Sequence, residues 1–118
     1  MLVRFLILST LIISSIFANE VMIVDVKARC TPNKLCTFFV TLKHKDTGWE
    51  HYANKWTIGT EDGKLLGSRT LHHPHVNEQP FTRSLSRVKI PEGIKKVYIK
   101  AYDSVHKESK DIFEYTIN

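Results

Sequence analysis

From residue 20 onward, apolar and polar side chains alternate with a period of two along most of the chain. Such alternation is typical of half-buried antiparallel strands, and a helical period is almost absent from the same region. The runs that share one apolar face lie within residues 22–28, 38–44, 52–58, 65–73, 81–90, 97–103 and 113–117. The pattern therefore predicts an all-β chain of about seven short strands.

Turn residues separate these runs. Asp62-Gly63 is typical of a hairpin turn, and Pro91-Glu92-Gly93 of a second turn. In the fifth run the inward phase shifts between Leu85 and Val88, which predicts a bulge near Ser86. Seven short strands with this spacing favour an antiparallel β-sandwich of the immunoglobulin or fibronectin type III kind, with a large aromatic residue of the third strand in its core.

The first residues follow a different pattern. Residues 1–18 contain one positive charge at Arg4, an apolar stretch from Phe5 to Phe17, and the small residue Ala18. This order is typical of a secretory signal peptide, which we expect to be cleaved after Ala18. The apolar stretch is shorter than the roughly 20 residues that a membrane-spanning helix needs. The sequence thus predicts a single mature domain, residues 19–118, that is periplasmic or secreted and has no membrane span.

Composition narrows the class of protein further. The chain has 118 residues and a formal net charge of +5, with its lysines scattered rather than gathered in a stripe. Export and scattered charge both argue against a nucleic-acid partner. Cys30 and Cys36 are the two cysteines, and in an exported protein a disulfide between them is expected. Metal binding by this Cys-x5-Cys pair is the alternative, although no further cysteine could complete a sulfur site.

Strand parity predicts where the connections lie. Antiparallel strands reverse direction at each connection, so the connections after the second, fourth and sixth strands share one end of the sandwich. These are the long ones, at residues 45–51, 72–80 and 104–110. All six histidines then map to this one end: His44, His51, His72, His73, His75 and His106.

A histidine cluster of this kind indicates a transition-metal site, because imidazole suits copper, zinc, iron and nickel. His73 and His75 are two residues apart and project to one side of an extended segment. We predict His73, His75 and His106 as ligands, with His51 as a fourth candidate. His44 and His72 are expected to be structural.

Two carboxylates belong to the same prediction. Asp103 continues the inward parity of the sixth strand, so it is a candidate ligand or a hydrogen-bond acceptor that orients a histidine. Glu78 is the second candidate. Met22 is the one methionine after the predicted cleavage site, which favours Cu(II) or zinc over Cu(I). The predicted role is metal carriage, delivery or sensing.

Other functions stay open. Trp49, Tyr52 and Arg83 could form a surface for a glycan or an envelope protein, in a binding module without catalysis. A small redox metalloenzyme with histidine ligands is a third hypothesis. The sequence shows no serine-nucleophile motif, phosphate-binding loop or paired carboxylates, so we do not expect hydrolase chemistry. The histidines could also be purely structural or line a pocket for a polar ligand without metal.

Three blocks of the sequence carry a resemblance. They are GWxHYAxxW at residues 48–56, HPHVxEQPFTRSL at residues 73–85, and DSVH at residues 103–106. Together they resemble an uncharacterised family of small exported bacterial proteins, in which the matching histidine positions are His51, His73, His75 and His106. Lys107 stands where that family tends to have glycine. The resemblance implies a bacterial envelope location and implies no activity.

Overall fold

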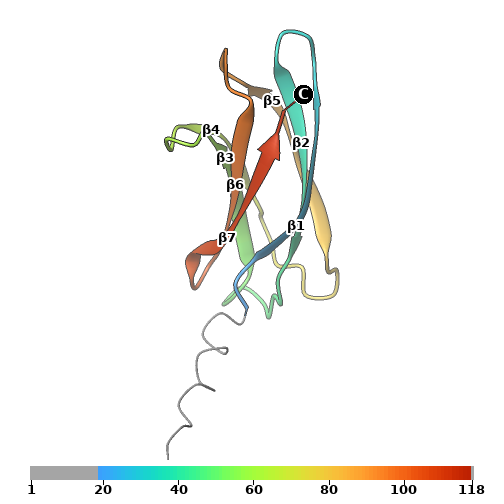
Figure 1. The fold of residues 1–118 in the computed structure, drawn as a ribbon. Helices are drawn as coiled ribbons and strands as arrows, with labels where there is room; N and C mark the ends of the chain where they lie inside the picture. Colours follow the sequence, from blue (N-terminus) through green and yellow to red (C-terminus); the bar gives the residue numbers. More distant parts are fainter. Residues whose placement is uncertain (1–18, 118) are drawn as a thin grey trace, which may run out of the picture.

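A computed structural model describes residues 19–117, so the predicted signal peptide lies outside the described residues. The described chain contains seven strands (Figure 1), which are β1 (Met22–Cys30), β2 (Leu35–Lys43), β3 (Ala53–Gly59), β4 (Leu65–Thr70), β5 (Phe81–Lys89), β6 (Lys96–Asp103) and β7 (Lys107–Thr116). Within this part of the chain, no helix is long and apolar enough to cross a membrane.

The strands form two antiparallel sheets. One sheet has the order β1-β2-β5 and the other has the order β4-β3-β6-β7. The two sheets face each other, with β1 beside β7 along one side and β4 beside β5 along the other. The predicted antiparallel β-sandwich of about seven strands is confirmed.

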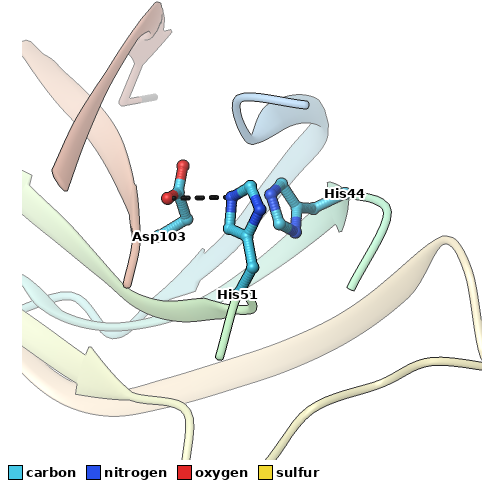
Figure 2. A group of neighbouring side chains, drawn as sticks. All are labelled: His44, His51 and Asp103. Carbon is cyan, nitrogen blue, oxygen red and sulfur yellow. Dashed lines mark ion pairs between the residues drawn. The ribbon is translucent and has the colours of Figure 1, made fainter. Parts of the chain in front are cut away.

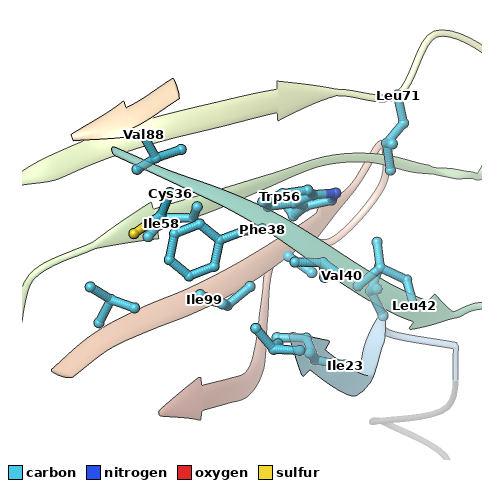
Figure 3. Packing of buried hydrophobic residues seen from close by; sticks show 14 of the residues in the cluster. Ile23, Cys36, Phe38, Val40, Leu42, Trp56, Ile58, Leu71, Val88 and Ile99 are labelled. Atoms are coloured by element: carbon cyan, nitrogen blue, oxygen red, sulfur yellow. The ribbon is translucent and has the colours of Figure 1, made fainter. Parts of the chain in front are cut away.

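The core lies between the two sheets (Figure 3). Every second residue of β2 faces inward, including Phe38 and Leu42, which are fully buried in the same apolar cluster as Trp56 and Ile58 of β3. Trp56 supplies the large aromatic residue expected in the third strand. Burial of each such side chain contributes about 1.5–3 kcal/mol, so the sandwich is stabilised mainly by this apolar layer.

Two irregularities modify the expected strand patterns. The pairing of β2 with β5 gains one residue between Leu85 and Val88, which confirms the predicted bulge. A second register shift lies in β1 between Ile23 and Asp25. It corrects the expected inward face of β1, because Ile23 is buried while Val24 is 49% exposed.

The fourth strand is shorter than expected. It ends at Thr70, so Leu71 and His73 lie beyond it, and Leu65 at its start is 62% exposed instead of facing the core. The long connection to β5 therefore begins at Leu71, which is buried and whose backbone N–H donates to the carbonyl oxygen of Asn54 at 2.9 Å.

The connections divide between two ends, as strand parity predicts. Residues 44–52, 71–80 and 104–106 connect β2–β3, β4–β5 and β6–β7 at one end, drawn at the bottom of Figure 1 and called here the loop end. The opposite end has the hairpin between β1 and β2, closed by the predicted disulfide between Cys30 and Cys36. This disulfide-closed end, called here the stapled end, therefore lies away from the histidines.

Candidate metal centre

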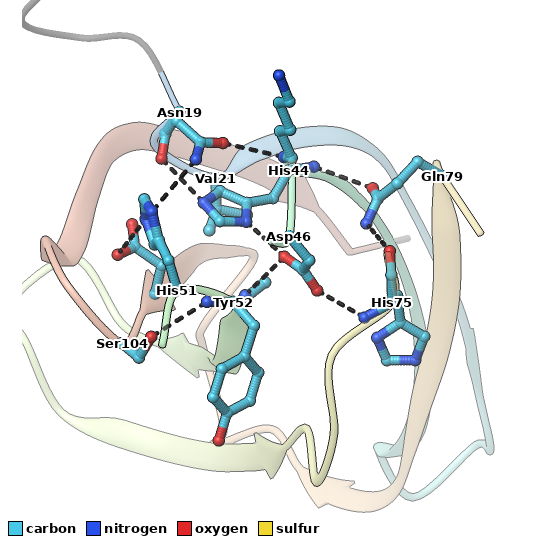
Figure 4. A network of polar contacts seen from close by, with 12 residues as sticks. Asn19, Val21, His44, Asp46, His51, Tyr52, His75, Gln79 and Ser104 are labelled. Atoms are coloured by element: carbon cyan, nitrogen blue, oxygen red, sulfur yellow. Dashed lines mark hydrogen bonds and ion pairs between the residues drawn. The ribbon is translucent and has the colours of Figure 1, made fainter. Parts of the chain in front are cut away.

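The buried carboxylate of Asp46 connects the chain segments of the loop end (Figure 4). Its Oδ1 accepts a hydrogen bond from the backbone N–H of Ala53 at 3.0 Å and lies 2.5 Å from Nδ1 of His44. Its Oδ2 accepts from the backbone N–H of His75 at 2.7 Å. The carboxylate thus fixes the start of β3 and the β4–β5 connection relative to the β2–β3 connection.

Gln79 adds a second link between the same two connections. Its Nε2 donates to the carbonyl oxygen of His75 at 2.9 Å, and its Oε1 accepts from the backbone N–H of His44 at 3.0 Å. The peptide bond between Gln79 and Pro80 is cis. His44 and His75 are therefore held by their backbones as well as by their rings.

Asp103 ends β6 and is completely buried. Its Oδ1 accepts from the backbone N–H groups of Val105 at 2.8 Å and His106 at 2.6 Å, and its Oδ2 lies 3.2 Å from Nδ1 of His106. Burial raises the pKa of Asp103, but the N–H donors of His106 and Val105 outweigh it and hold the pKa below its ordinary value of 3.8. The site therefore contains a fixed negative charge at neutral pH.

His51 lies on the other side of this carboxylate. Its Nε2 is 3.2 Å from Oδ1 of Asp103, close enough for an ion pair, but the angle does not suit a hydrogen bond and this buried nitrogen has no other partner among the described residues. Its Nδ1 lies 3.3 Å from Nδ2 of Asn19. Both ring nitrogens are thus turned toward polar groups of the cluster.

His44 is buried, and both its ring nitrogens face oxygen atoms. Nδ1 faces Asp46, and Nε2 lies 2.8 Å from the carbonyl oxygen of Asn19. The His44 and His51 rings are 4.8 Å apart between centroids and inclined by 69°. These contacts agree with the structural role expected for His44, and they also place it within reach of the predicted ligand His51.

Among the described residues, His44, His51 and Asp103 form a group of side chains of the types that bind metals (Figure 2). One ligand atom from each lies within 4.8 Å of the others, so the group could hold a metal ion. The His106 ring is 5.0 Å from the His51 ring. Because Nδ1 of His106 faces Asp103, the neutral His106 ring can carry its proton there and offer Nε2 to a metal.

His73 and His75 form a second pair, with ring centroids 4.7 Å apart. The His75 ring stacks on Phe81 at 4.0 Å, and its Nε2 lies 2.8 Å from a guanidinium nitrogen of Arg83. Because guanidinium only donates hydrogen bonds, Nε2 must accept and the proton must lie on Nδ1, which is buried without a partner among the described residues. Burial, the charge of Arg83 and the charge of His73 together lower the pKa of His75.

The predicted ligands thus occur as two pairs. His51 and His106 both face Asp103, and His73 lies against His75, which contacts Arg83. Within the described residues, no ring contact or side-chain hydrogen bond joins one pair to the other. A single metal site built from all four histidines stays a prediction.

The other predicted site residues lie at the same end. Glu78 is exposed and lies 3.6 Å from the half-buried Arg83, so the two form an ion pair. Trp49 is 66% exposed and touches Tyr52 edge-to-face with 5.5 Å between ring centroids. Val76 and Val105 are also exposed on neighbouring connections. Trp49 thus remains available to a partner, while Tyr52 is half-buried beneath it and offers less surface.

Sequence reasoning missed three residues of the cluster. Asp46 and Asn19 were not singled out, and His44 was expected only to be structural. The His44-x-Asp46 spacing is a weak signal, because it places two polar side chains on one face of an extended segment. Asn19 gives no such signal, because its contacts join positions 25 and 32 residues apart in the chain.

We compared the chain with known proteins, and the result is a match to one similar protein. No protein-family model matches the chain, and no solved structure matches it. A protein named "Putative lipoprotein" from Halomicrobium mukohataei is 37% identical over 93 residues. The match covers 79% of this chain and 45% of the relative, so the chain spans less than half of the relative's length.

Proposed function

We propose that this is an exported protein of the cell envelope that binds Cu(II) or zinc at the loop end, in metal carriage, delivery or sensing. One observation carries the proposal, namely that ligand atoms of His44, His51 and Asp103 lie within 4.8 Å of one another. The name of the relative, a lipoprotein, supports export, and so does the disulfide. Imidazole with one carboxylate is a donor set that suits both metals.

The present geometry sets what metal binding requires. Bonds of about 2.0–2.2 Å place the ligand atoms of one zinc ion about 3–3.5 Å apart, so the widest separation in the group, up to 4.8 Å, must contract by roughly 1.5 Å. His44 must also release one of the two oxygen atoms that its ring faces. Asp103 already holds His106 by Nδ1, and a carboxylate partner of this kind orients a histidine and raises its basicity toward a metal.

The experiment compares two double variants that each remove two histidines. Cu(II) and Zn(II) are titrated separately into the purified, processed protein, into His51→Ala/His106→Ala, and into His73→Ala/His75→Ala. Thermal unfolding in the presence of a chelator checks that each variant is folded. We expect near-stoichiometric binding that the first double variant abolishes and the second preserves.

The other results have equally clear meanings. Loss of binding only in His73→Ala/His75→Ala moves the site to the second pair and refutes the group around Asp103. Binding weaker than micromolar in the unmodified protein refutes the metal-binding function altogether.

A binding surface for a glycan or protein is a second candidate, favoured by the 66% exposure of Trp49. Aromatic side chains stack on sugar rings and are enriched in protein interfaces. This candidate is tested by Trp49→Ala, which should abolish partner binding and leave metal binding unchanged. Glycan arrays and envelope extracts treated with a chelator separate the two candidates, because a partner that binds through Trp49 alone is indifferent to metal removal.

A further inference from the structure

Asn19 is built into the histidine cluster by three separate contacts. Its carbonyl oxygen lies 2.8 Å from Nε2 of His44, its Oδ1 accepts from the backbone N–H of Lys45 at 3.0 Å, and its Nδ2 lies 3.3 Å from Nδ1 of His51. Its φ of 66° lies in the left-handed region that asparagine tolerates better than most residues. The contacts with His44, Lys45 and His51 therefore hold Asn19 in one position within the cluster.

These contacts determine which ring nitrogen of His51 carries the proton. The N–H of Lys45 needs an acceptor, so the side-chain oxygen of Asn19 faces it and the NH₂ group faces His51. Nδ1 of His51 must then accept, and the proton of the neutral ring lies on Nε2, toward Asp103. The His51 lone pair is thus directed at Asn19. A metal on this side of His51 leaves Asp103 in the second of its two predicted roles, as the charged group that orients His51, and not as a ligand.

Asn19 therefore occupies the position of a ligand between two histidines. It covers Nδ1 of His51 with its side chain and Nε2 of His44 with its carbonyl group. A metal bound by these two nitrogens would lie where the polar atoms of Asn19 are now (Figure 4).

The predicted cleavage after Ala18 changes the chemistry of this same residue. Before cleavage the backbone nitrogen of Asn19 is an amide, whose lone pair is delocalised into the peptide bond and is a poor metal donor. After cleavage it is a primary amine. Covalent geometry keeps this nitrogen about 3 Å from the carbonyl oxygen of its own residue, which in turn touches His44.

We propose that the α-amino group of Asn19, released by cleavage after Ala18, is a ligand of the bound metal together with His51 and His44. The inference rests on the proposed metal-binding function and deepens it. Only the processed chain has this donor, so export and metal loading are coupled and the precursor does not take the metal in the same way.

The main comparison keeps every side chain of residues 19–118 and moves only the amine. The full chain with its leader is expressed and exported, and intact mass establishes its first residue. The matched variant has one glycine inserted between Ala18 and Asn19, which shifts the amine by about 3.8 Å and leaves an amide at Asn19. Asn19→Ala retains the amine and removes the side-chain contacts.

Two readouts follow for each form. Cu(II) affinity is measured by competition with a chelator, and we expect at least a ten-fold loss on glycine insertion and a smaller loss for Asn19→Ala. The proteins are also labelled with ¹⁵N only in asparagine, and pulsed electron paramagnetic resonance of the Cu(II) form is recorded. We expect a directly coordinated ¹⁵N in the processed chain and none in the glycine-extended chain, because the other asparagines are the same in both.

Each alternative result overturns the inference in a distinguishable way. Equal affinity and no ¹⁵N coupling in either form leave the metal site standing and exclude the amine as a ligand. A first residue other than Asn19 removes the premise of the inference. No metal binding by either form refutes the proposed function and the inference together.

Discussion

Asp46→Asn is the most informative single substitution, because the replacement has the same shape and changes only the pattern of donors and acceptors. In the native chain, Oδ1 of Asp46 is the acceptor for two groups, the backbone N–H of Ala53 and Nδ1 of His44. Its Oδ2 is the acceptor for one group, the backbone N–H of His75. The asparagine oxygen is expected to stay with the two donors. Its NH₂ group then replaces Oδ2, which lies 2.7 Å from the backbone nitrogen of His75 in the native chain, so two hydrogen-bond donors face each other.

The magnitude follows from these contacts. One buried hydrogen bond is replaced by two opposed donors, and the bond to His44 loses its charge. A buried donor without an acceptor costs about 1–3 kcal/mol and a hydrogen bond to a charged group contributes about 1.5–3 kcal/mol, so we expect a loss of about 2–4 kcal/mol. For a domain of this size each kcal/mol lowers Tm by about 4–8 °C.

Urea unfolding and calorimetry at pH 7 with a chelator present measure this loss. Asp25→Asn is the matched control, because this carboxylate is half exposed and its Lys27 partner is 4.0 Å away, so it should change stability by less than about 0.5 kcal/mol. If Asp46→Asn is as mild as the control, the carboxylate does not hold the three connections together and the interpretation of the loop end fails.

Three further predictions concern the site, the stapled end and pH. Asp103→Asn should weaken Cu(II) or Zn(II) affinity about 10–100-fold, measured by competition titration, because it removes a carboxylate that orients the ligands; unchanged affinity would contradict this. Cys30→Ser/Cys36→Ser should lower the free energy of unfolding by about 2 kcal/mol, from the entropy of opening a short loop, yet leave metal affinity unchanged because the disulfide is at the opposite end; a loss of metal binding would show that the two ends are coupled. His75 has a pKa below its ordinary 6.5, chiefly through burial and then through Arg83. Below about pH 6.5, His75 is therefore protonated more fully in the unfolded chain than in the folded chain. The free energy of unfolding should fall as the pH drops through this range. Urea unfolding at pH 5.5 and 7.5 checks this, and Arg83→Met should reduce the difference; an equal difference in both proteins would remove Arg83 from the explanation.

Much of the fold could be predicted because it depends on local alternation. The inward residues of β2 and the bulge between Leu85 and Val88 are visible as a period of two and its interruption. The β1 register shift is hidden, because Ile23 and Val24 are both apolar and the sequence does not say which one faces inward.

The candidate site divides in the same way. Strand parity by itself places the histidines at one end, because antiparallel strands must alternate direction. It does not determine which side chains meet there. The structure pairs His51 with His106 around Asp103, and it pairs His73 with His75 near Arg83.

The sandwich, the disulfide-closed hairpin and the end at which the histidines gather are all predictable from the sequence, since each follows from spacing along one strand or between neighbouring turns. The contacts of Asp46 with three segments, and of Asn19 with His44 and His51, are visible only in the folded chain. Such contacts depend on how connections far apart in the chain fold over the end of the core, and a buried polar group takes whichever partner that packing brings within hydrogen-bonding distance.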